Sequence, residues 1–460
     1  MTRLRRELGV WGAASIVVGT VIGSGIFLVP RKMLLETGSV ELVFAVWVFG
    51  GLLSMAGALT YAELATMMPE AGGEYNYLRA AYGPFWGFLY GWTQMWVAKS
   101  GSIATLATGF FYYLANFRPE LEQTLFRIPV PLGAGGGPVE VSSGQLLAMA
   151  VILALGWLNW FGIRVGGRVQ VAVTACKLLL IGWIVAAGLG GETVRNAAPL
   201  EQARGGVAGF FAALVAALWA YDGWNNLSMV ASEVKSPQRT LPRALIFGTA
   251  LVMGTYLLAN YAYFRVLSPA EAASSDRIAA VMMQRVLGGW GADLVSVAAM
   301  ISIFAALNGS ILSGSRVPYA LARDGYFFRP FGVVHEKHAT PGFSILALSA
   351  WSAVLVLSGR YDQLVTLVIF PSWILYGMAT AAVLVLRRKM PGAERPYRTL
   401  GYPVVPVLFV LVAGLLTVQT LMHSARESLM GLGLILCGVP FYVRWKKRAE
   451  TAAQTAAEAP

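Results

Sequence analysis

The stretch Gly19-Thr-Val-Ile-Gly-Ser-Gly-Ile-Phe-Leu-Val-Pro30 lies in the middle of the first long apolar segment of the chain. Gly23 and Gly25 flank a serine, which makes this the poorest helix-forming part of a segment otherwise long enough to cross a bilayer. We expect the helix to break there. Backbone groups without helical partners at membrane depth must face protein or a polar cavity, because lipid cannot hydrogen-bond to them. The break is therefore a candidate binding site.

The composition is typical of a membrane protein. Of the 460 residues, 57% are hydrophobic and 13% are charged, whereas roughly a quarter of the residues of a soluble protein are charged. Apolar runs of about 20 residues, each able to span a bilayer core, recur along the chain. They predict an all-α integral membrane fold with twelve spans. The expected spans are approximately 9–35, 41–68, 86–116, 144–163, 169–190, 207–234, 243–266, 291–322, 342–358, 361–387, 402–423 and 428–446.

The distribution of positive charge predicts the topology. With the N-terminus in the cytoplasm, the cytoplasmic loops and termini carry about twice as many Lys and Arg residues as the opposite side. We therefore expect a multi-pass membrane protein with both termini cytoplasmic. The asymmetric placement of Lys and Arg explains the net charge of +12 by membrane topology, so the charge does not indicate nucleic-acid binding. Cys176 and Cys437 both lie in apolar segments, so a disulfide framework between loops is excluded.

The sixth apolar segment repeats the irregularity of the first. Its sequence Leu218-Trp-Ala-Tyr-Asp-Gly-Trp-Asn-Asn226 places a carboxylate, a glycine and two asparagines near mid-membrane, where a charge is costly unless compensated. Two interrupted segments in corresponding positions of two five-span halves indicate a transporter built of inverted repeats. The expected halves are 1–190 and 207–387, followed by two accessory spans at 402–446 and a cytoplasmic tail at 447–460. The alternative is a pair of kinked structural helices.

Broken helices of this kind suit a zwitterionic ligand. Exposed N–H groups favour an anion and exposed carbonyls favour a cation. The amides expected to hold a carboxylate are those of Ser24, Gly25 and Ile26. The carbonyls expected to hold an ammonium are those of Thr20, Val21, Trp219 and Ala220. The choice of ligand side chain would then fall to neighbours such as Trp219, Asn225, Asn226 and Trp373.

Two features outside the spans are also predicted. The segment 69–83 opens with turn residues and continues with aromatic and apolar residues at helical spacing, which favours an interfacial helix. Ser268-Pro-Ala-Glu271 has the pattern of a capping box and indicates a short extracellular helix.

Several motifs, taken in order, resemble the L-type amino acid transporter family of the amino acid, polyamine and organocation superfamily. The matching stretches are 19–30, 61–64, 72–75, 169–179, 220–225, 260–264, 308–310 and 394–396. The resemblance covers nearly the whole chain. It implies the leucine-transporter fold, alternating access and exchange of amino acids, with an aromatic residue at Trp219 closing over the substrate. Because relatives carry phenylalanine there, the larger ring favours small or medium neutral substrates.

Lys177 lies deep in the fifth span, about eight residues from Arg168 at its cytoplasmic end. The resemblance implies that this lysine occupies the place where sodium-coupled relatives hold an ion. It would tether the broken first span through carbonyls near Gly19 and through the hydroxyl of Ser310 or Ser313, and transport would be sodium-independent. The alternative is a snorkelling lysine, but the interface is on the order of 12 Å away, about twice the length of the side chain.

Three further ionisable residues lie within spans. Lys99 is expected to pair with Asp222 or to line the pathway. Asp222 replaces a glycine of better-known family members, and it could attract an ammonium, cap a half-helix or neutralise a lysine. Glu63 could belong to an inner gate, or it could be a solvated carboxylate at a helix end.

Other functions are weighed against transport of neutral L-amino acids. His335 and His338 have the wrong spacing for a zinc protease, and no metal-binding or nucleophilic group of residues lies at membrane depth, so neither an enzyme nor a cofactor is expected. A proton-coupled carrier, or one for cationic amino acids or polyamines, remains the main competitor. Eukaryotic members of the family pair with a heavy chain through a cysteine after span three, and the loop 116–144 contains none. We therefore expect a stand-alone, prokaryotic-like protein of the inner cell membrane without a disulfide-linked partner, and the oligomeric state stays open.

Overall fold

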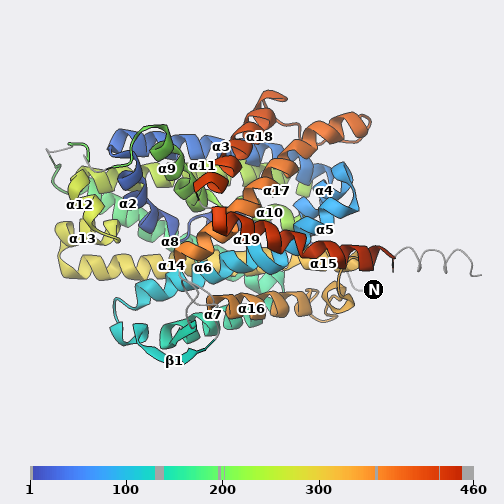
Figure 1. Cartoon of the computed structure of the whole chain (residues 1–460), viewed down its shortest axis with the longest axis horizontal. Coiled ribbons are helices and arrows are strands. Elements are labelled where there is room, and N and C mark those ends of the chain that lie inside the picture. The colour runs from blue at the N-terminus through green and yellow to red at the C-terminus, as the bar shows by residue number, and fades with distance from the viewer. Residues whose placement is uncertain are drawn as a thin grey trace, which may run out of the picture.

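The computed structural model describes residues 4–129, 139–194, 198–200, 203–357, 361–423 and 425–447. The predicted tail therefore lies outside the described residues, except for residue 447. The chain folds into a bundle in which most of the long helices run along the longest dimension of the molecule (Figure 1).

Eight helical segments are long and apolar enough to cross a membrane, and a bent pair forms a ninth. Six of the eight correspond to the helices α3 (Val40–Met67), α7 (Ser143–Trp160), α8 (Ile163–Gly190), α11 (Pro237–Val266), α17 (Tyr361–Lys389) and α18 (Val404–His423). The others are α14 (Gly289–Gly314) with its continuation α15 (Arg316–Arg323), and the segment Ser428–Lys447, which includes most of α19 (Ala425–Leu436).

Three of the twelve predicted spans do not meet this criterion in the described part of the chain. The predicted span 86–116 is divided into α5 (Pro84–Thr93), a π-helical turn (Gln94–Ala98) and α6 (Lys99–Leu114). In the predicted span 207–234, the long helix α9 (Gly206–Tyr221) ends at Tyr221, and only short helical turns follow. The helix α16 (Gly342–Val356) has only 15 residues. These segments are apolar but shorter or less regular than the sequence pattern suggested.

The first and sixth apolar segments are interrupted at the expected places. The helix α1 (Val10–Val21) ends before the two glycines, and α2 (Gly25–Thr37) continues at an angle of 40°. The helix α9 is followed by a non-helical turn and then by one helical turn, α10 (Asn226–Met229), and a 3₁₀ turn at Ala231–Glu233. The glycines and the polar residues therefore interrupt the helices as predicted.

The two shorter helices predicted outside the spans are present. The helix predicted within 69–83 is α4 (Glu74–Tyr82). Ser268 and Glu271 form a capping box at the start of α12 (Pro269–Ser274), which is followed by α13 (Ile278–Leu287). Only the capping pattern identified α12, because six residues are too few for a periodicity argument.

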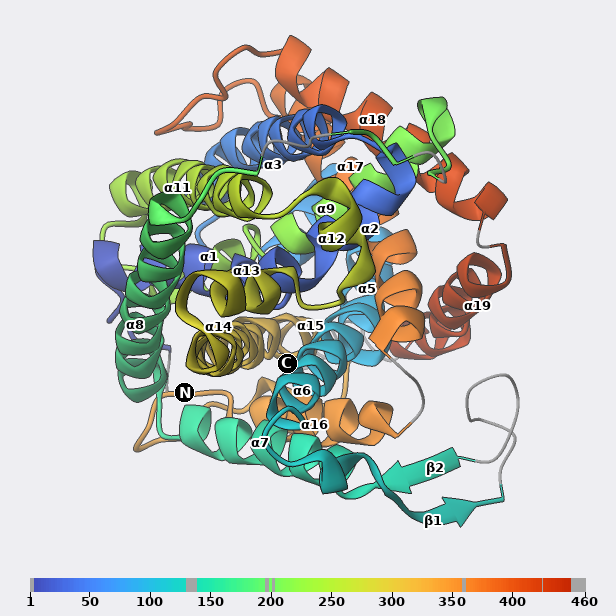
Figure 2. The same ribbon diagram turned by 90° about the vertical axis from the view of Figure 1, so that its left-hand side faces the viewer.

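An antiparallel hairpin of β1 (Thr124–Ile128) and β2 (Val139–Ser142) was not predicted. It lies at the edge of the bundle beside α7 (Figure 2). Leu125 and Phe126 of β1 are both exposed, so β1 lacks the alternation of buried and exposed residues that usually reveals a strand in a sequence. The strand β2 does alternate, but over only four residues.

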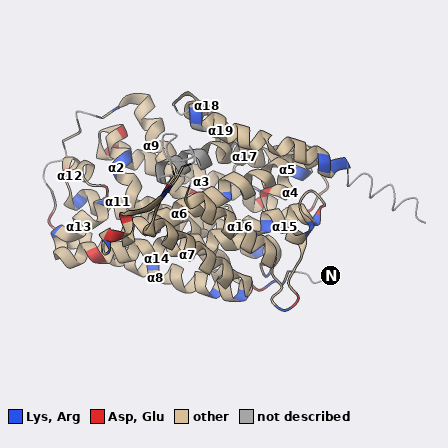
Figure 3. Cartoon of the chain, turned by 60° about the horizontal axis from the view of Figure 1, so that its bottom comes forward, with Lys and Arg blue, Asp and Glu red and all other residues tan. Residues whose placement is uncertain are grey.

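Burial separates a central group of helices from a peripheral one. In the apolar window of Gly289–Arg323, 72% of the residues are buried, whereas the corresponding share in Val404–Met422 is 22%. Seen along the bundle, α1, α2 and α9 lie toward the middle, and α18 and α19 lie at the outer edge (Figure 2). Charged residues gather at the two ends of the bundle, and its middle is mostly uncharged (Figure 3). A membrane-spanning protein is expected to have this distribution.

One end of the bundle is joined to the N-terminal segment. Leu8 forms a parallel β-bridge with Val234, and the amides of Glu7 and Leu8 both donate to the carbonyl of Glu233. The carboxylate of Glu233 is itself buried and forms a two-pronged ion pair with Arg316 of α15, at 2.7 and 3.1 Å. The extended N-terminus, the end of the broken sixth segment and α15 are thus connected.

Candidate functional site

The two helix breaks contact one another directly. The hydroxyl of Thr20 donates to the carbonyl of Gly223 over 2.9 Å. Gly25 lies so close to the end of α9 that a Cβ at this position would be 2.7 Å from the Cα of Ala220. Only glycine allows this approach. The interruptions are therefore parts of one junction between α1, α2, α9 and α10.

Tyr256 of α11 holds the ends of the two broken helices together. Its hydroxyl lies 2.9 Å from the carbonyl oxygen of Val21 and 2.7 Å from that of Ala220, and it shares its one proton between them. Both carbonyls would otherwise lack a helical partner. Tyr256 is not among the residues predicted from the sequence. The sequence did contain a clue to Tyr256, because a tyrosine hydroxyl in the middle of an apolar span needs a polar partner.

The start of α2 offers donors beside this junction. Ser24 is the N-cap residue, and its side chain does not cap the helix. The first amides of any helix have no acceptor within that helix, and the helix dipole adds partial positive charge at this end. The amides of Gly25 and Ile26 are therefore suited to an anionic group such as a carboxylate.

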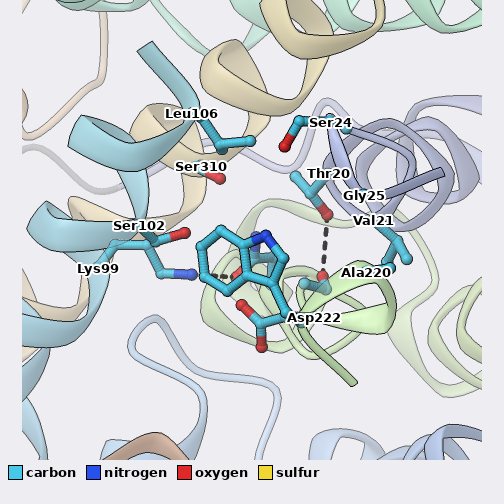
Figure 4. A pocket seen from close by; sticks show the side chains of 14 residues that line it. Thr20, Val21, Ser24, Gly25, Lys99, Ser102, Leu106, Ala220, Asp222 and Ser310 are labelled. Carbon is cyan, nitrogen blue, oxygen red and sulfur yellow. Dashed lines mark hydrogen bonds between the residues drawn. The ribbon is translucent and has the colours of Figure 1, made fainter. Parts of the chain in front are cut away.

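A pocket opens at the junction. Side chains of α6, α9 and α14 complete its wall (Figure 4). Its lining residues are Thr20, Val21, Gly23, Ser24, Gly25, Lys99, Ser102, Leu106, Trp219, Ala220, Asp222, Gly223, Asn226 and Ser310. Seven of the nine residues predicted to bind substrate are among them, together with Lys99 and Ser310.

The remaining predicted site residues lie elsewhere. Ile26 and Asn225 are fully buried and do not line the pocket, and Asn226 takes the place expected for Asn225. Trp373, expected in the pathway, instead stacks on Phe409 of α18 with 5.7 Å between ring centroids. The side chains of Asn225 and Trp373 therefore do not line this pocket, and a role for Trp373 in gating or in the pathway stays a prediction.

Glu63 is not a solvated carboxylate, because its side chain is 1% exposed. Arg387 of α17 donates to both of its oxygens, at 2.9 and 2.7 Å, and the amide of Thr399 donates at 2.7 Å. Arg395 lies 3.3 Å away. Glu63 thus connects α3, α17 and the loop after α17 at one end of the bundle, away from the pocket.

Lys177 of α8 is completely buried and lies against the first break. Its ammonium donates to the carbonyl of Gly19 over 2.8 Å and to that of Ile22 over 2.5 Å. The hydroxyl of Ser302 in α14 also donates to Ile22, over 3.0 Å. A snorkelling lysine would leave these carbonyls, whereas this side chain joins α8 to the end of α1.

The α14 hydroxyl beside Lys177 differs from the predicted one. Ser302 shares the carbonyl of Ile22 with the lysine, whereas Ser310 lines the pocket and Ser313 donates to Gly309 of its own helix. The expected participation of Ser310 or Ser313 in the tether is therefore wrong. Ser302 and Ser310 both belong to α14 and are eight residues apart, which is about two helical turns. The prediction therefore chose the right helix but the wrong turn of it.

Lys99 and Asp222 bring opposite charges to the pocket wall. The ammonium of Lys99 donates to Asn226 over 2.6 Å, and the carboxylate of Asp222 accepts from the hydroxyl of Tyr376 over 2.8 Å. In the described part of the chain, neither forms an ion pair within 4.0 Å. Lys99 begins α6 directly after the π-helical turn, an irregularity often found at functional sites.

Glu74 belongs to the motif at 72–75 and is not among the site residues predicted from the sequence. It is fully buried at the start of α4, and its carboxylate accepts hydrogen bonds from Asn225 and Ser228, which flank the start of α10. Burial raises the pKa of Glu74, and the hydrogen bond from Asn225 lowers it by a smaller amount. The interfacial helix is thereby joined to the segment that follows the second break.

Comparison with known proteins agrees with this geometry. Residues 8–439 match the family model described as "Amino acid permease". The chain belongs to the amino acid permease family. The serine/threonine exchanger SteT of Bacillus subtilis is 32% identical over 97% of this chain and 98% of its own. The human b(0,+)-type amino acid transporter 1 is 32% identical over 96% of this chain and 88% of its own, and the human cystine/glutamate transporter is 28% identical over 97% and 87%.

Membership of the amino acid permease family confirms the resemblance stated from the motifs. The family consists of permeases rather than enzymes, so the alternative of a membrane enzyme is set aside. Family membership and the apolar helices together show that the protein crosses a membrane several times. Its activity is the transport of amino acids. Within the described residues, no group of three or more His, Cys, Asp or Glu side chains could hold a metal ion.

Proposed function

We propose that this permease is a sodium-independent exchanger of neutral L-amino acids that works by alternating access in the inner cell membrane. The proposed architecture is the leucine-transporter fold, with inverted repeats at 1–190 and 207–387, two accessory spans at 402–446 and both termini in the cytoplasm. No disulfide-linked heavy chain is required, because the loop 116–144 has no cysteine.

The observation that carries the proposal is the meeting of the two helix breaks at one pocket. The α2 amides offer donors to a carboxylate, and the ends of α1 and α9 offer carbonyls to an ammonium. The carbonyls of Val21 and Ala220 already accept one hydrogen bond each from Tyr256. A carbonyl oxygen has two lone pairs, so each can accept a second one. These groups are main-chain atoms, so they recognise the part that all amino acids share.

Lys177 supports sodium independence. The ammonium of Lys177 already donates hydrogen bonds to the carbonyl oxygens of Gly19 and Ile22. A sodium ion at the same carbonyls would have to displace that charge, which like-charge repulsion opposes. The names of the relatives support exchange of amino acids more broadly, since SteT is described as an exchanger.

The test uses purified protein in proteoliposomes loaded with labelled alanine, leucine or threonine. Exchange predicts that efflux requires an external amino acid and is unchanged when choline replaces sodium. Rapid efflux into amino-acid-free buffer would contradict exchange, and a requirement for sodium would contradict the role given to Lys177.

The buried carboxyl of Glu74 favours proton coupling as a second candidate. Its pKa is raised by burial, and it contacts the segment after the second break. A proton-coupled carrier would accumulate labelled alanine in vesicles without internal amino acid when the outside is made acidic. The proposed exchanger would not.

A further inference from the structure

Lys99 and Asp222 approach the pocket from different elements. Lys99 extends from the start of α6, and Asp222 lies in the turn after α9, so that both point toward the same space (Figure 4). Side chains that meet at such a place contact whatever part of a ligand extends beyond its main-chain groups. The main-chain groups themselves are recognised by the ends of α1, α2 and α9.

Both residues keep hydrogen-bonding capacity for a ligand. An ammonium has three N–H donors, and that of Lys99 uses one on Asn226. A carboxylate can accept about four hydrogen bonds, and that of Asp222 accepts one from Tyr376. The ligand would therefore meet a donor and an acceptor of opposite charge.

Two hydroxyls extend this polar surface. Ser102 lies one helical turn after Lys99, and Ser310 faces the pocket from α14. Neither hydroxyl is hydrogen-bonded to another group among the described residues. The apolar part of the wall is supplied chiefly by Trp219 and Leu106, which limit the size of the ligand.

The charge of this surface disfavours two classes of ligand side chain. An apolar side chain would remove water from Lys99 and Asp222 without replacing the hydrogen bonds of that water, which is unfavourable for any polar group and more so for a charged one. A charged side chain would pair with one of the two residues and be repelled by the other. A neutral group with both a donor and an acceptor satisfies both residues.

We propose that the transported amino acid has a neutral polar side chain, a hydroxyl or a carboxamide, which donates to Asp222 and accepts from Lys99. This inference rests on the proposed function, because it describes the side chain of the substrate that the broken helices hold. Lys99 and Asp222 are then residues that determine specificity, and the main-chain groups of the junction are not.

The test compares substrates of equal size that differ in polarity. Exchange of labelled threonine and valine, and of asparagine and leucine, is measured at low concentration in proteoliposomes. Threonine is expected to exceed valine by about tenfold or more in rate, because sites built to hydrogen-bond a substrate group reject analogues that lack it. Equal rates for threonine and valine overturn the inference and leave the exchanger intact. Absence of exchange with every neutral amino acid overturns the proposed function itself.

Two variants locate the discrimination. Lys99→Met and Asp222→Asn keep the size of the side chain and remove its charge, and each should bring the threonine-to-valine ratio closer to one. The matched controls Lys32→Met and Asp293→Asn alter exposed residues outside the pocket and should keep the wild-type ratio. An unchanged ratio in both folded pocket variants would contradict the assignment. If a pocket variant fails to fold, the wild-type comparison still decides.

Discussion

The ammonium nitrogen of Lys177 lies 2.8 Å from the carbonyl oxygen of Gly19, although 158 positions separate them in the sequence. This contact joins the middle of α8 to the last turn of α1, where the helix leaves carbonyls without partners. A covalent chain alone would leave the break free to rearrange. The lysine therefore helps to define the shape of the first break.

Replacing Lys177 with methionine should reduce exchange strongly. The substitution keeps the apolar stem but removes every donor, and a buried carbonyl left unsatisfied costs about 1–3 kcal/mol. We expect the rate of amino acid exchange to fall at least about tenfold, while the amount of folded protein stays similar. Lys32→Met, which alters an exposed lysine of α2, is the control. Wild-type exchange by folded Lys177→Met would refute the tether.

Replacing Gly25 with alanine should separate the two breaks. The added methyl group would lie 2.7 Å from the Cα of Ala220, where backbone has to move. Overpacking of this kind typically costs about 1–3 kcal/mol. We expect a lower melting temperature and loss of exchange. Gly182→Ala is the matched control, because a methyl group there meets nothing within 4 Å. The close approach would be irrelevant if the two variants melted and transported alike.

Removing the carboxylate of Glu63 should destabilise the protein more than removing a surface carboxylate. Glu63→Ala leaves Arg387 and Arg395 without their partner, and breaking a buried pair costs about 3–5 kcal/mol. Glu140→Ala, which breaks an exposed pair with Arg127, should cost about 0–1 kcal/mol. Denaturant unfolding of both variants in detergent measures the difference. Similar losses would show that the buried network contributes little.

Glu271 provides a prediction about pH. Its hydrogen bonds from Arg285 and Ser268 lower its pKa to about 2, below the value of about 4.3 for an unfolded glutamate. The contribution of this carboxylate to stability is therefore fully present above about pH 4.3 and is lost as the pH falls through about 2. NMR titration should give a midpoint near 2, rising in Arg285→Ala and unchanged in Arg127→Ala. A midpoint near 4 in the wild type would disprove the pairing.

The helix breaks could be predicted because their causes are local. Glycines near Ser24, and a carboxylate with a glycine at 222–223, disfavour a continuous helix wherever the segment lies in the fold. The same reasoning placed donors and carbonyls at the ends of the broken helices. Lys177 was identified for a related reason, because an ammonium deep in an apolar span needs partners.

The contacts that complete the site could not be predicted in this way. Tyr256 and Ser302 reach the junction from other helices, and no local pattern states which helices are neighbours. Asn225 and Asn226 are adjacent in the sequence but project about 100° apart when helical. Without the register of α10, the sequence could not show that Asn226 faces the pocket and Asn225 faces Glu74. Apolar composition likewise could not show that the predicted spans 86–116 and 342–358 form irregular or shorter helices, so the count of twelve spans stays a prediction.

The β-bridge between Leu8 and Val234 gives the molecule an accessible reporter position. Residues 7 and 8 are bonded to the segment that follows the second break, so a displacement of that segment would carry the N-terminal strand with it. Arg5 precedes this strand and is exposed. A fluorophore attached there would sense rearrangements of the broken sixth segment without occupying the pocket, and would allow single transporters to be followed in real time.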